Sequence, residues 1–232
     1  MPTSTLVLLT KNEVEGSKAL FDKIPWKSFD ESFVVDYRST DSTVEFFEGK
    51  GVRVVRQEIP GRGEVFRMAC RIAKGDILVF FSPDGNEDPA DTVRLRDLVA
   101  NGCDLAVASR FAQGSRNDEA EKLLPLRAWA NQAFTIAANL LFGGRMTDTI
   151  NGFRAVRKEK LLALHPDAQG FAIEYQISIR AMKLGYNICE IPTREGDRIG
   201  GASTASSVPT GLKVLKVLLR ELWIGKGFRN EK

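Results

Sequence analysis

The chain has 232 residues, which at roughly 100–200 residues per domain suggests one large domain or one domain with a tail. Hydrophobic residues make up 43% and charged residues 27%, and these near-average values exclude a disordered, collagen-like or coiled-coil chain. The net charge of +3 is too small to indicate nucleic acid as a partner.

The N-terminus and the cysteines indicate a cytoplasmic protein. The opening MPTSTLVLL lacks a basic region and a cleavage signature, so no signal peptide is expected, and no run of apolar residues is long enough to span a bilayer. Cys70, Cys103 and Cys189 form no CxxC pair, and with a single histidine they cannot build a structural zinc site. We therefore expect three reduced thiols.

Short apolar runs alternate with amphipathic stretches in the first half of the chain. Strands are expected at residues 6–9, 33–35, 52–55, 77–81 and 105–108, and helices over 13–23, 42–49 (with a Ser42–Glu45 capping box), 64–73 and 91–101. This alternation predicts an α/β fold with a mostly parallel central sheet flanked by helices. Because ligands bind at the carboxyl ends of strands in such sheets, the loops after Leu9, Val35, Phe81 and Ala108 are the candidate site.

The second half of the chain is less regular. Helices are expected over residues 123–142 and 172–184, a strand over 188–192, a loop over 148–157 and a mobile segment rich in Gly, Ser and Thr over 196–209. Residues 210–224 are amphipathic, with a leucine face and a basic face that includes Lys213 and Lys216. This stretch fits a helix packed on the domain, and it also fits a helix lying on an anionic membrane with Trp223 at the headgroups.

Two of the candidate loops carry acids. Asp36 ends the second strand and could bind a ribose or base, although Asp36 and Asp41 also fit turn and cap residues. The loop after Phe81 reads SPDGNEDP over residues 82–89, and such oxygen-rich clusters hold Mg²⁺ or Mn²⁺ together with substrate phosphates. A polar turn with a helix cap at Asp88 is the alternative for this loop.

Basic groups are spread more widely than the acids. Gly61-Arg62-Gly63 precedes a helix and could let the backbone approach a phosphate, or it could be a plain turn. Arginines suit phosphate contacts if they converge in the fold. The candidates are Arg110, Arg127, Arg154, Arg194 and Arg198.

Seven short motifs occur in a fixed order along the chain, and the ordered set is more specific than any one of them. They are TKNE at 10–13, VDYRSTD at 35–41, SPDGNEDP at 82–89, ASR at 108–110, DTINGFR at 148–154, FAIE at 171–174 and RIGGAS at 198–203. Together they resemble the inverting family 2 glycosyltransferases, in particular the dolichol-phosphate mannose synthase-like branch, over about residues 5–205. The resemblance implies a GT-A fold, a nucleotide-sugar donor and a divalent cation, Mg²⁺ or Mn²⁺. It also implies transfer with inversion to a polyprenyl (dolichyl-type) phosphate.

The resemblance assigns roles to particular residues. On the donor side, Asp36 would hold the base or ribose, together with Thr10, Asn12, Glu13, Val35 and Arg62. Asp84 and Asn86 would hold the cation that bridges the diphosphate, which makes Asp84 a catalytic residue. Arg110, Arg127 and Arg198 would receive the acceptor's phosphate. A lipid phosphate is already an anion at pH 7 and needs no strong general base, which agrees with a single histidine, His165, in an expected surface turn.

The chain departs from the family pattern at five positions. Tyr37 and Ser82 stand where the family has acids, Arg38 stands where it has glycine, and Leu9 and Lys11 replace the usual Pro and Tyr. These departures keep two alternatives open: a family 2 transferase with a glycan or small-molecule acceptor, and a degenerate nucleotide-sugar-binding domain without turnover.

The expected organisation follows from these motifs. We expect residues 1–209 to form the GT-A domain and residues 210–232 to form a basic C-terminal helix and tail. The protein would lie in the cytoplasm, in peripheral contact with the cytoplasmic face of a membrane.

Overall fold

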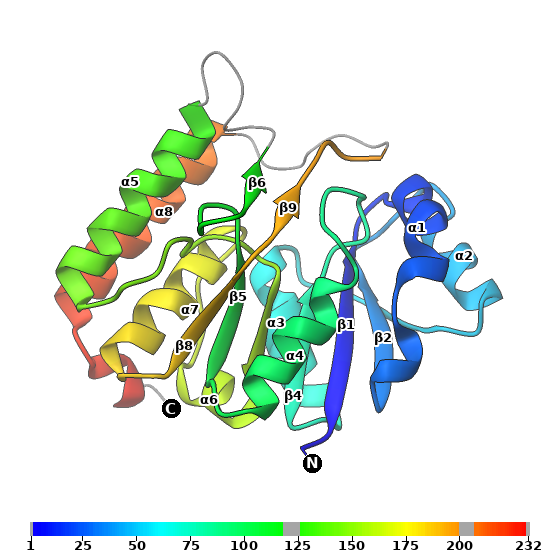
Figure 1. Ribbon diagram of the computed structural model, residues 1–232, viewed down its shortest axis with the longest axis horizontal. Coiled ribbons are helices and arrows are strands. Elements are labelled where there is room, and N and C mark those ends of the chain that lie inside the picture. Colours follow the sequence, from blue (N-terminus) through cyan, green and yellow to red (C-terminus); the bar gives the residue numbers. More distant parts are fainter. Residues whose placement is uncertain (1, 118–125, 200–206, 231–232) are drawn as a thin grey trace.

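The computed structural model describes residues 2–117, 126–199 and 207–230 (Figure 1). The main-sheet strands are β1 (Ser4–Thr10), β2 (Glu31–Asp36), β3 (Arg53–Arg56), β4 (Ile77–Phe81), β5 (Leu105–Ser109), β7 (Arg154–Arg157) and β8 (Ile188–Pro192), and β6 (Arg116–Asn117) pairs separately with β9 (Arg194–Glu195). The helices are α1 (Val14–Leu20), α2 (Thr43–Gly49), α3 (Arg62–Ile72), α4 (Asp91–Ala100), α5 (Leu126–Phe142), α6 (Lys158–Ala163), α7 (Ala172–Lys183) and α8 (Ser207–Ile224), with 3₁₀ turns at Phe21–Lys23, Trp26–Ser28 and Gly227–Asn230.

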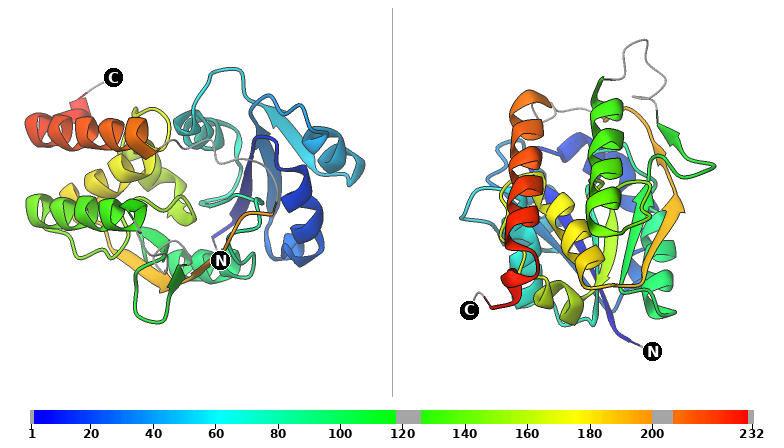
Figure 2. Two further views of the ribbon diagram at one scale, coloured as in Figure 1. Left: turned by 90° about the horizontal axis from the view of Figure 1, so that it is seen from above. Right: turned by 90° about the vertical axis from the view of Figure 1, so that its left-hand side faces the viewer.

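The seven strands form one sheet in the order β3-β2-β1-β4-β7-β5-β8, in which only β7 runs antiparallel to its neighbours. One apolar cluster lies between the sheet and helices α3, α5, α6, α7 and α8, and a second lies between the sheet and helices α1, α2 and α4. Helices therefore cover both faces, as Figure 2 also shows, and the predicted mostly parallel α/β sheet is confirmed.

The central strands owe their place to unbroken apolar runs. Every residue of β1, β4 and β5 is buried, which a strand requires when helices cover both faces of the sheet. All five strands predicted in the first half are observed, each within two residues of its expected ends.

One element of the second half contradicts the sequence prediction. Residues 154–157, expected to be loop, form β7, which lies between β4 and β5 in the middle of the sheet, and α6 follows it directly. The strand escaped prediction because it reads Arg-Ala-Val-Arg, and arginines do not signal a buried strand. Arg154 is nevertheless fully buried, since it donates to the backbone oxygens of Asn151 and Glu174.

The predicted capping box at α2 is also wrong. Ser42 lies in the left-handed region, with φ of 68°, and makes no side-chain cap hydrogen bond. Asp41 caps the helix instead, because its Oδ1 accepts from the Thr43 amide at 3.2 Å. Its Oδ2 accepts from the Val14 amide at 3.1 Å, so the same carboxylate also holds the start of α1.

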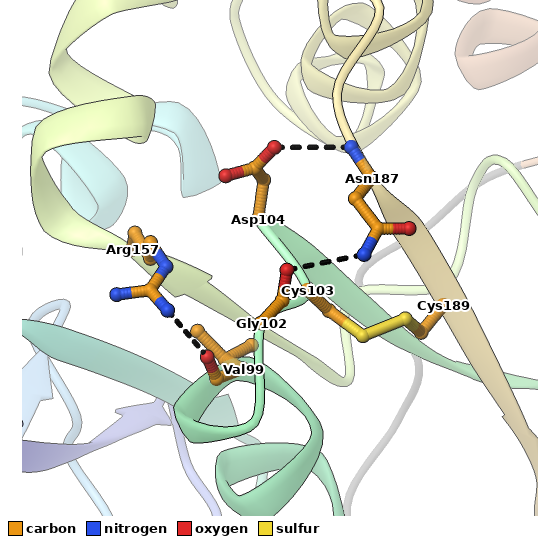
Figure 3. The surroundings of a disulfide bond; sticks show 7 residues. All are labelled: Val99, Gly102, Cys103, Asp104, Arg157, Asn187 and Cys189. Atoms are coloured by element: carbon orange, nitrogen blue, oxygen red, sulfur yellow. Dashed lines mark hydrogen bonds between the residues drawn. A yellow bond between two sulfur atoms is a disulfide. The ribbon is translucent and has the colours of Figure 1, made fainter. Parts of the chain in front are cut away.

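The expectation of three reduced thiols is corrected for two of the cysteines. Cys103, two residues before β5, and Cys189 of β8 form a disulfide (Figure 3). Cys70 is free and buried. The separation of 86 residues concealed this pair, which only the neighbouring positions of β5 and β8 bring together. The thiol argument for a cytoplasmic location therefore no longer applies.

A buried charge network fixes helix α8 to helix α7. Glu221 accepts from Arg180 at 2.9 Å, from Lys183 at 2.7 Å and from Gln176 at 3.1 Å, and Glu221 and Arg180 are fully buried. Val214, Val217 and Leu218 of the same face pack into the apolar cluster beneath. Helix α8 is thus packed on the domain, one of the two alternatives that its sequence left open.

We expect the substitution Glu221→Ala to destabilise the protein by about 3–5 kcal/mol, because it removes the fully buried carboxylate that Arg180 and Lys183 share and leaves Arg180 with Asp167 as its one remaining acid among the described residues. Urea unfolding measures this loss. The control Lys216→Ala removes an exposed side chain of the same helix and should change stability by less than about 0.5 kcal/mol. A similar small loss for both variants would contradict the prediction.

Some expectations fall outside the described residues. The N-terminal end of the predicted 123–142 helix and half of the 196–209 segment lie among residues 118–125 and 200–206. Within the described ranges, no helix is both long enough and apolar enough to cross a membrane.

Candidate functional site

The site is built where β1, β2, β4 and β5 end at one edge of the sheet. Thr10 pairs with Asp36, and Leu8 pairs with Phe81, so the loops that follow these strands emerge together. After β8 the chain returns across this edge of the sheet. We call the returning segment, which consists of β9 and residues 196–199, the strap. Five segments that are distant in sequence therefore surround one place.

The loops after β1 and β2 are tied to each other by the predicted donor-side residues. Asp36 accepts from the Thr10 hydroxyl at 2.8 Å and from the Ser39 amide at 2.9 Å. Asn12, in the left-handed region with φ of 56°, accepts from the Thr40 amide at 2.8 Å. Asp36 is only 1% exposed, so in this state its carboxylate shapes the loop.

Val35 needs a correction, because its side chain packs in the apolar cluster beside α3 and does not line the site. Three of the departures from the family pattern, Lys11, Tyr37 and Arg38, stack on one another nearby. The Lys11 ammonium and the Arg38 guanidinium lie 4.9 and 5.8 Å from the centre of the Tyr37 ring. This edge of the site is therefore cationic where the family pattern is acidic.

The loop after β4 carries the predicted cation ligands. Asp84 is almost fully buried, and its Oδ1 accepts weakly from the Asn86 amide at 3.3 Å. The close approach of helix α1 depends on Gly16, where an added Cβ would lie 2.4 Å from the Pro83 carbonyl oxygen. This contact brings Glu13, just before α1, beside the Asp84 carboxylate.

Arg198 of the strap joins these two acids. Its Nη1 donates to Asp84 Oδ2 at 2.7 Å and its Nη2 to Glu13 Oε1 at 2.5 Å. Burial raises the pKa of Asp84, while the charges of Arg198 and Arg62 lower it. The predicted acceptor arginine and the predicted cation ligand thus touch each other.

Arg62 is the first residue of α3, and its side chain lies near the acids of the loop after β4. Its guanidinium pairs with Glu174 of α7, and Gly152 makes room for the pair, since a Cβ there would collide with the guanidinium. The charge of Arg62 also acts on Glu87, whose pKa is raised well above its usual range by burial and by the charges of Asp84 and Glu195. Arg62 therefore lies within an acidic group of side chains.

Arg110 lies at the end of β5 and is held by two acids. Its Nε and Nη2 donate to the two oxygens of Asp148 at 2.6 and 3.1 Å, and Glu195 lies 3.6 Å from its Nη1. Burial raises the pKa of Glu195, while Arg110 and Arg127 lower it, which places Arg127 near the same group. Arg110 therefore contacts both Asp148 and Glu195, whereas Arg127 of α5 is exposed and acts on Glu195 through its charge.

Sequence reasoning missed the carboxylates that position the arginines. Glu174 and Asp148 lie inside motifs quoted above, yet only the fold reveals that each pairs with an arginine. Glu195, three residues after the predicted strand 188–192, carried no signal. Of the other arginines, Arg154 lies in the core and Arg194 is exposed, so they do not join the group.

The acids of the described residues fit a cation only in part. No group of three or more His, Cys, Asp or Glu side chains is arranged to hold a metal in the part of the chain that the structure describes. Asn86 Oδ1, however, is buried without a hydrogen-bond partner, and an orphaned acceptor beside a carboxylate is a suitable pair of oxygen ligands. Asp84 and Asn86 therefore fit a cation that takes its remaining ligands from phosphates and water.

Glu13 should make stability depend on pH. Burial raises its pKa to about 7, although Arg198 lowers it. Because the folded protein binds this proton more tightly than the unfolded chain, the stabilisation is complete below about pH 4.5 and is lost as the pH rises through about 7. We expect Glu13→Gln to reduce this decline in urea unfolding measured across that range.

The exposed Glu15 of the same helix provides the control. Glu15→Gln should leave the pH dependence of the wild type unchanged. Equal slopes for the wild type and Glu13→Gln would contradict the assignment.

Comparisons with known sequences add independent information. The profile of the family described as "Glycosyl transferase family 2" matches residues 12–164. The chain is 28% identical over 186 residues to "Dolichyl-phosphate hexose transferase" of Haloferax volcanii, covering 79% of each. It is 27% identical over 227 residues to "Undecaprenyl-phosphate mannosyltransferase" of Micrococcus luteus, covering 91% of this chain and 90% of that protein.

Solved structures are similar at lower identity. Glucosyl-3-phosphoglycerate synthase from Mycobacterium tuberculosis, crystallised with Mn²⁺, UDP-glucose and phosphoglyceric acid, matches with a TM-score of 0.75 at 23% identity. The match covers 96% of this chain and 80% of that one. This likeness confirms the fold class expected from the sequence.

Proposed function

The chain belongs to glycosyl transferase family 2, and from this membership we propose that it moves a hexose from a nucleotide-diphosphate sugar to a polyprenyl phosphate, with inversion at the anomeric carbon. Its GT-A fold and its place in the dolichol-phosphate mannose synthase-like branch agree with the activities for which the two relatives are named. The observation that carries the proposal is that Arg198, from the later half of the chain, pairs with Glu13 of the β1 loop and Asp84 of the β4 loop, while the charge of Arg110 acts on Glu87 of the β4 loop.

On the donor side, Thr10, Asn12 and Asp36 shape the pocket for the nucleoside, and Asp84 and Asn86 hold Mg²⁺ or Mn²⁺. A bound cation would neutralise charge on the departing diphosphate. Arg62 adds a positive charge on the same side, fixed by Glu174. Because Ser82 supplies no carboxylate, we expect the donor's phosphates to complete the cation's ligands.

On the acceptor side, Arg110, Arg127 and Arg198 receive the lipid phosphate. The phosphate attacks as an anion, so these guanidinium groups position it and no strong general base is needed. The placement of His165 agrees, because the residue is exposed in a turn after α6 and is not part of the charged group.

We further propose that residues 210–232 and helix α5 contact the cytoplasmic face of a membrane, next to the catalytic domain formed by residues 1–209. Helices α5 and α8 lie on the same side of the molecule (Figure 2). Both expose large apolar side chains, and Trp223 is 88% exposed. The exposed residues are Leu126, Trp129, Ile136, Leu140 and Leu141 on α5, and Leu212, Leu215, Leu219, Leu222 and Trp223 on α8.

A transfer assay tests the function. The purified protein is incubated with individual nucleotide sugars, Mg²⁺ or Mn²⁺ and a polyprenyl phosphate, and the lipid product is identified by mass spectrometry. We expect a glycosyl phospholipid with one donor. Product formed only on a glycan or small-molecule acceptor would overturn the lipid acceptor, and thermal stabilisation by a donor without any transfer would favour the non-catalytic alternative.

A further inference from the structure

The strap is hydrogen-bonded to the loop after β4, residues 82–89, at two positions. The Gly196 amide donates to the Asn86 carbonyl oxygen at 2.9 Å, and the Ile199 amide donates to the Asp84 carbonyl oxygen at 2.8 Å. Between these bonds, the Ile199 side chain rests on Gly85, where an added Cβ would lie 2.5 Å from Ile199 Cγ1. The backbone of the strap therefore holds Arg198 beside this loop, from where its flexible side chain reaches Asp84 and Glu13.

The Arg198 guanidinium is the positive charge between Asp84 and Glu13. It uses Asp84 Oδ2 and Glu13 Oε1, and its side chain is only 26% exposed. The arrangement is nevertheless incompletely bonded. Three buried polar atoms around it lack a hydrogen-bond partner within the described residues: Glu13 Oε2, Asn86 Oδ1 and Arg198 Nε. Buried groups without partners are rare in folded proteins, so their clustering here indicates that another group completes the site.

We propose that Arg198 blocks the cation site of the ligand-free chain, and that binding of the cation releases it for the acceptor. The proposal rests on the proposed function for the identity of the acceptor. A divalent cation and the guanidinium compete for the Asp84 carboxylate, so the cation binds only when Arg198 moves away. The displaced guanidinium is then free to receive an anionic phosphate.

This competition sets an order of binding. While Arg198 is paired with Asp84 and Glu13, it is not available to the acceptor phosphate. The cation, with the donor diphosphate, therefore binds first and the lipid phosphate second. In the ligand-free chain, the blocking contact also lowers the apparent affinity for the cation, because only the fraction of molecules with Arg198 displaced can bind it.

Binding of Mn²⁺ alone tests the proposal without any transfer. Free Mn²⁺ is measured by electron paramagnetic resonance during titration of the wild type, Arg198→Gln and Arg194→Gln. If the contact is made in about nine-tenths of molecules, Arg198→Gln should bind Mn²⁺ roughly tenfold more tightly than the wild type. Arg194 is exposed on the same segment, so Arg194→Gln should bind like the wild type.

A second measurement covers the case in which Arg198→Gln is unstable, since it leaves Asp84 and Glu13 without their cation. Mn²⁺ should then raise the melting temperature of this variant more than that of the wild type. Equal or weaker Mn²⁺ affinity in Arg198→Gln, or an equal thermal shift, would overturn the proposal.

The two proposals fail separately. Suppose Arg198→Gln binds Mn²⁺ more tightly but the wild type transfers sugar to no lipid phosphate: the proposed function is then wrong, and the proposed block of the cation site by Arg198 is supported. Suppose instead that the wild type transfers sugar and the variant has unchanged Mn²⁺ affinity: the proposed block is then wrong, and the proposed function is supported.

Discussion

The substitution Asp84→Asn is expected to reduce sugar transfer by roughly a thousandfold, equivalent to about 4 kcal/mol of transition-state stabilisation. Asparagine keeps the size of the side chain but removes the charge that would hold the cation against the diphosphate. The loop itself should persist, since its backbone is fixed by Gly196 and Ile199 of the strap. The rate of product formation at saturating donor and acceptor measures the loss.

Asp88 offers a matched control in the same loop. Its exposed carboxylate accepts from the Ala90 amide at 2.9 Å and does not reach Arg198 or Arg62. Asp88→Asn should therefore transfer at close to the wild-type rate. Full activity in Asp84→Asn would remove the cation assignment, and an equal loss in both variants would indicate that the loop, rather than the Asp84 charge, was damaged.

The substitution Arg110→Ala should impair the protein in two ways. It removes a cation from the acceptor side, and a charge-assisted contact to a phosphate contributes about 1.5–3 kcal/mol, or roughly a tenfold to hundredfold weaker use of the lipid phosphate. It also leaves Asp148 ionised and fully buried without its partner, which should destabilise the fold by about 3–5 kcal/mol. Transfer kinetics and urea unfolding separate the two effects.

The double variant Arg110→Ala with Asp148→Asn distinguishes function from folding. Neutralising Asp148 should restore much of the lost stability, because no uncompensated charge remains. Acceptor use should stay impaired, since the guanidinium is still absent. If the double variant recovers both stability and transfer, Arg110 has a structural role alone.

The sequence predicted the half of the fold in which burial is encoded locally. Strands such as Ile77–Phe81 are apolar throughout and are bounded by turn residues, so their positions follow from hydrophobicity. The segment Arg154–Arg157 also lies in the middle of the sheet, but its two arginines hid it, because the Arg154 charge is satisfied by the backbone oxygens of nearby Asn151 and of Glu174 on α7. A pattern of apolar residues does not record such partners.

The sequence likewise predicted only part of the candidate site. The motif positions Asp36, Asp84 and Asn86 could be read from the order of segments, and the structure places all three at one edge of the sheet. The partners that hold the arginines could not be read in this way. Glu174 lies 112 positions from Arg62, and Asp148 lies 38 from Arg110, so each pair forms only when strands and helices pack.

The amino-acid sequence by itself determined the α/β class, the positions of the acid-bearing loops after β2 and β4, and the family, because apolar periodicity and the order of short motifs are properties of neighbouring residues. Only the tertiary structure decided that Cys103 bonds to Cys189, that Glu221 of α8 pairs with Arg180 of α7, and that Arg198 pairs with Asp84. The reason is physical: charges and thiols pair across space with whatever packing brings near, and the chain must fold before those distances exist.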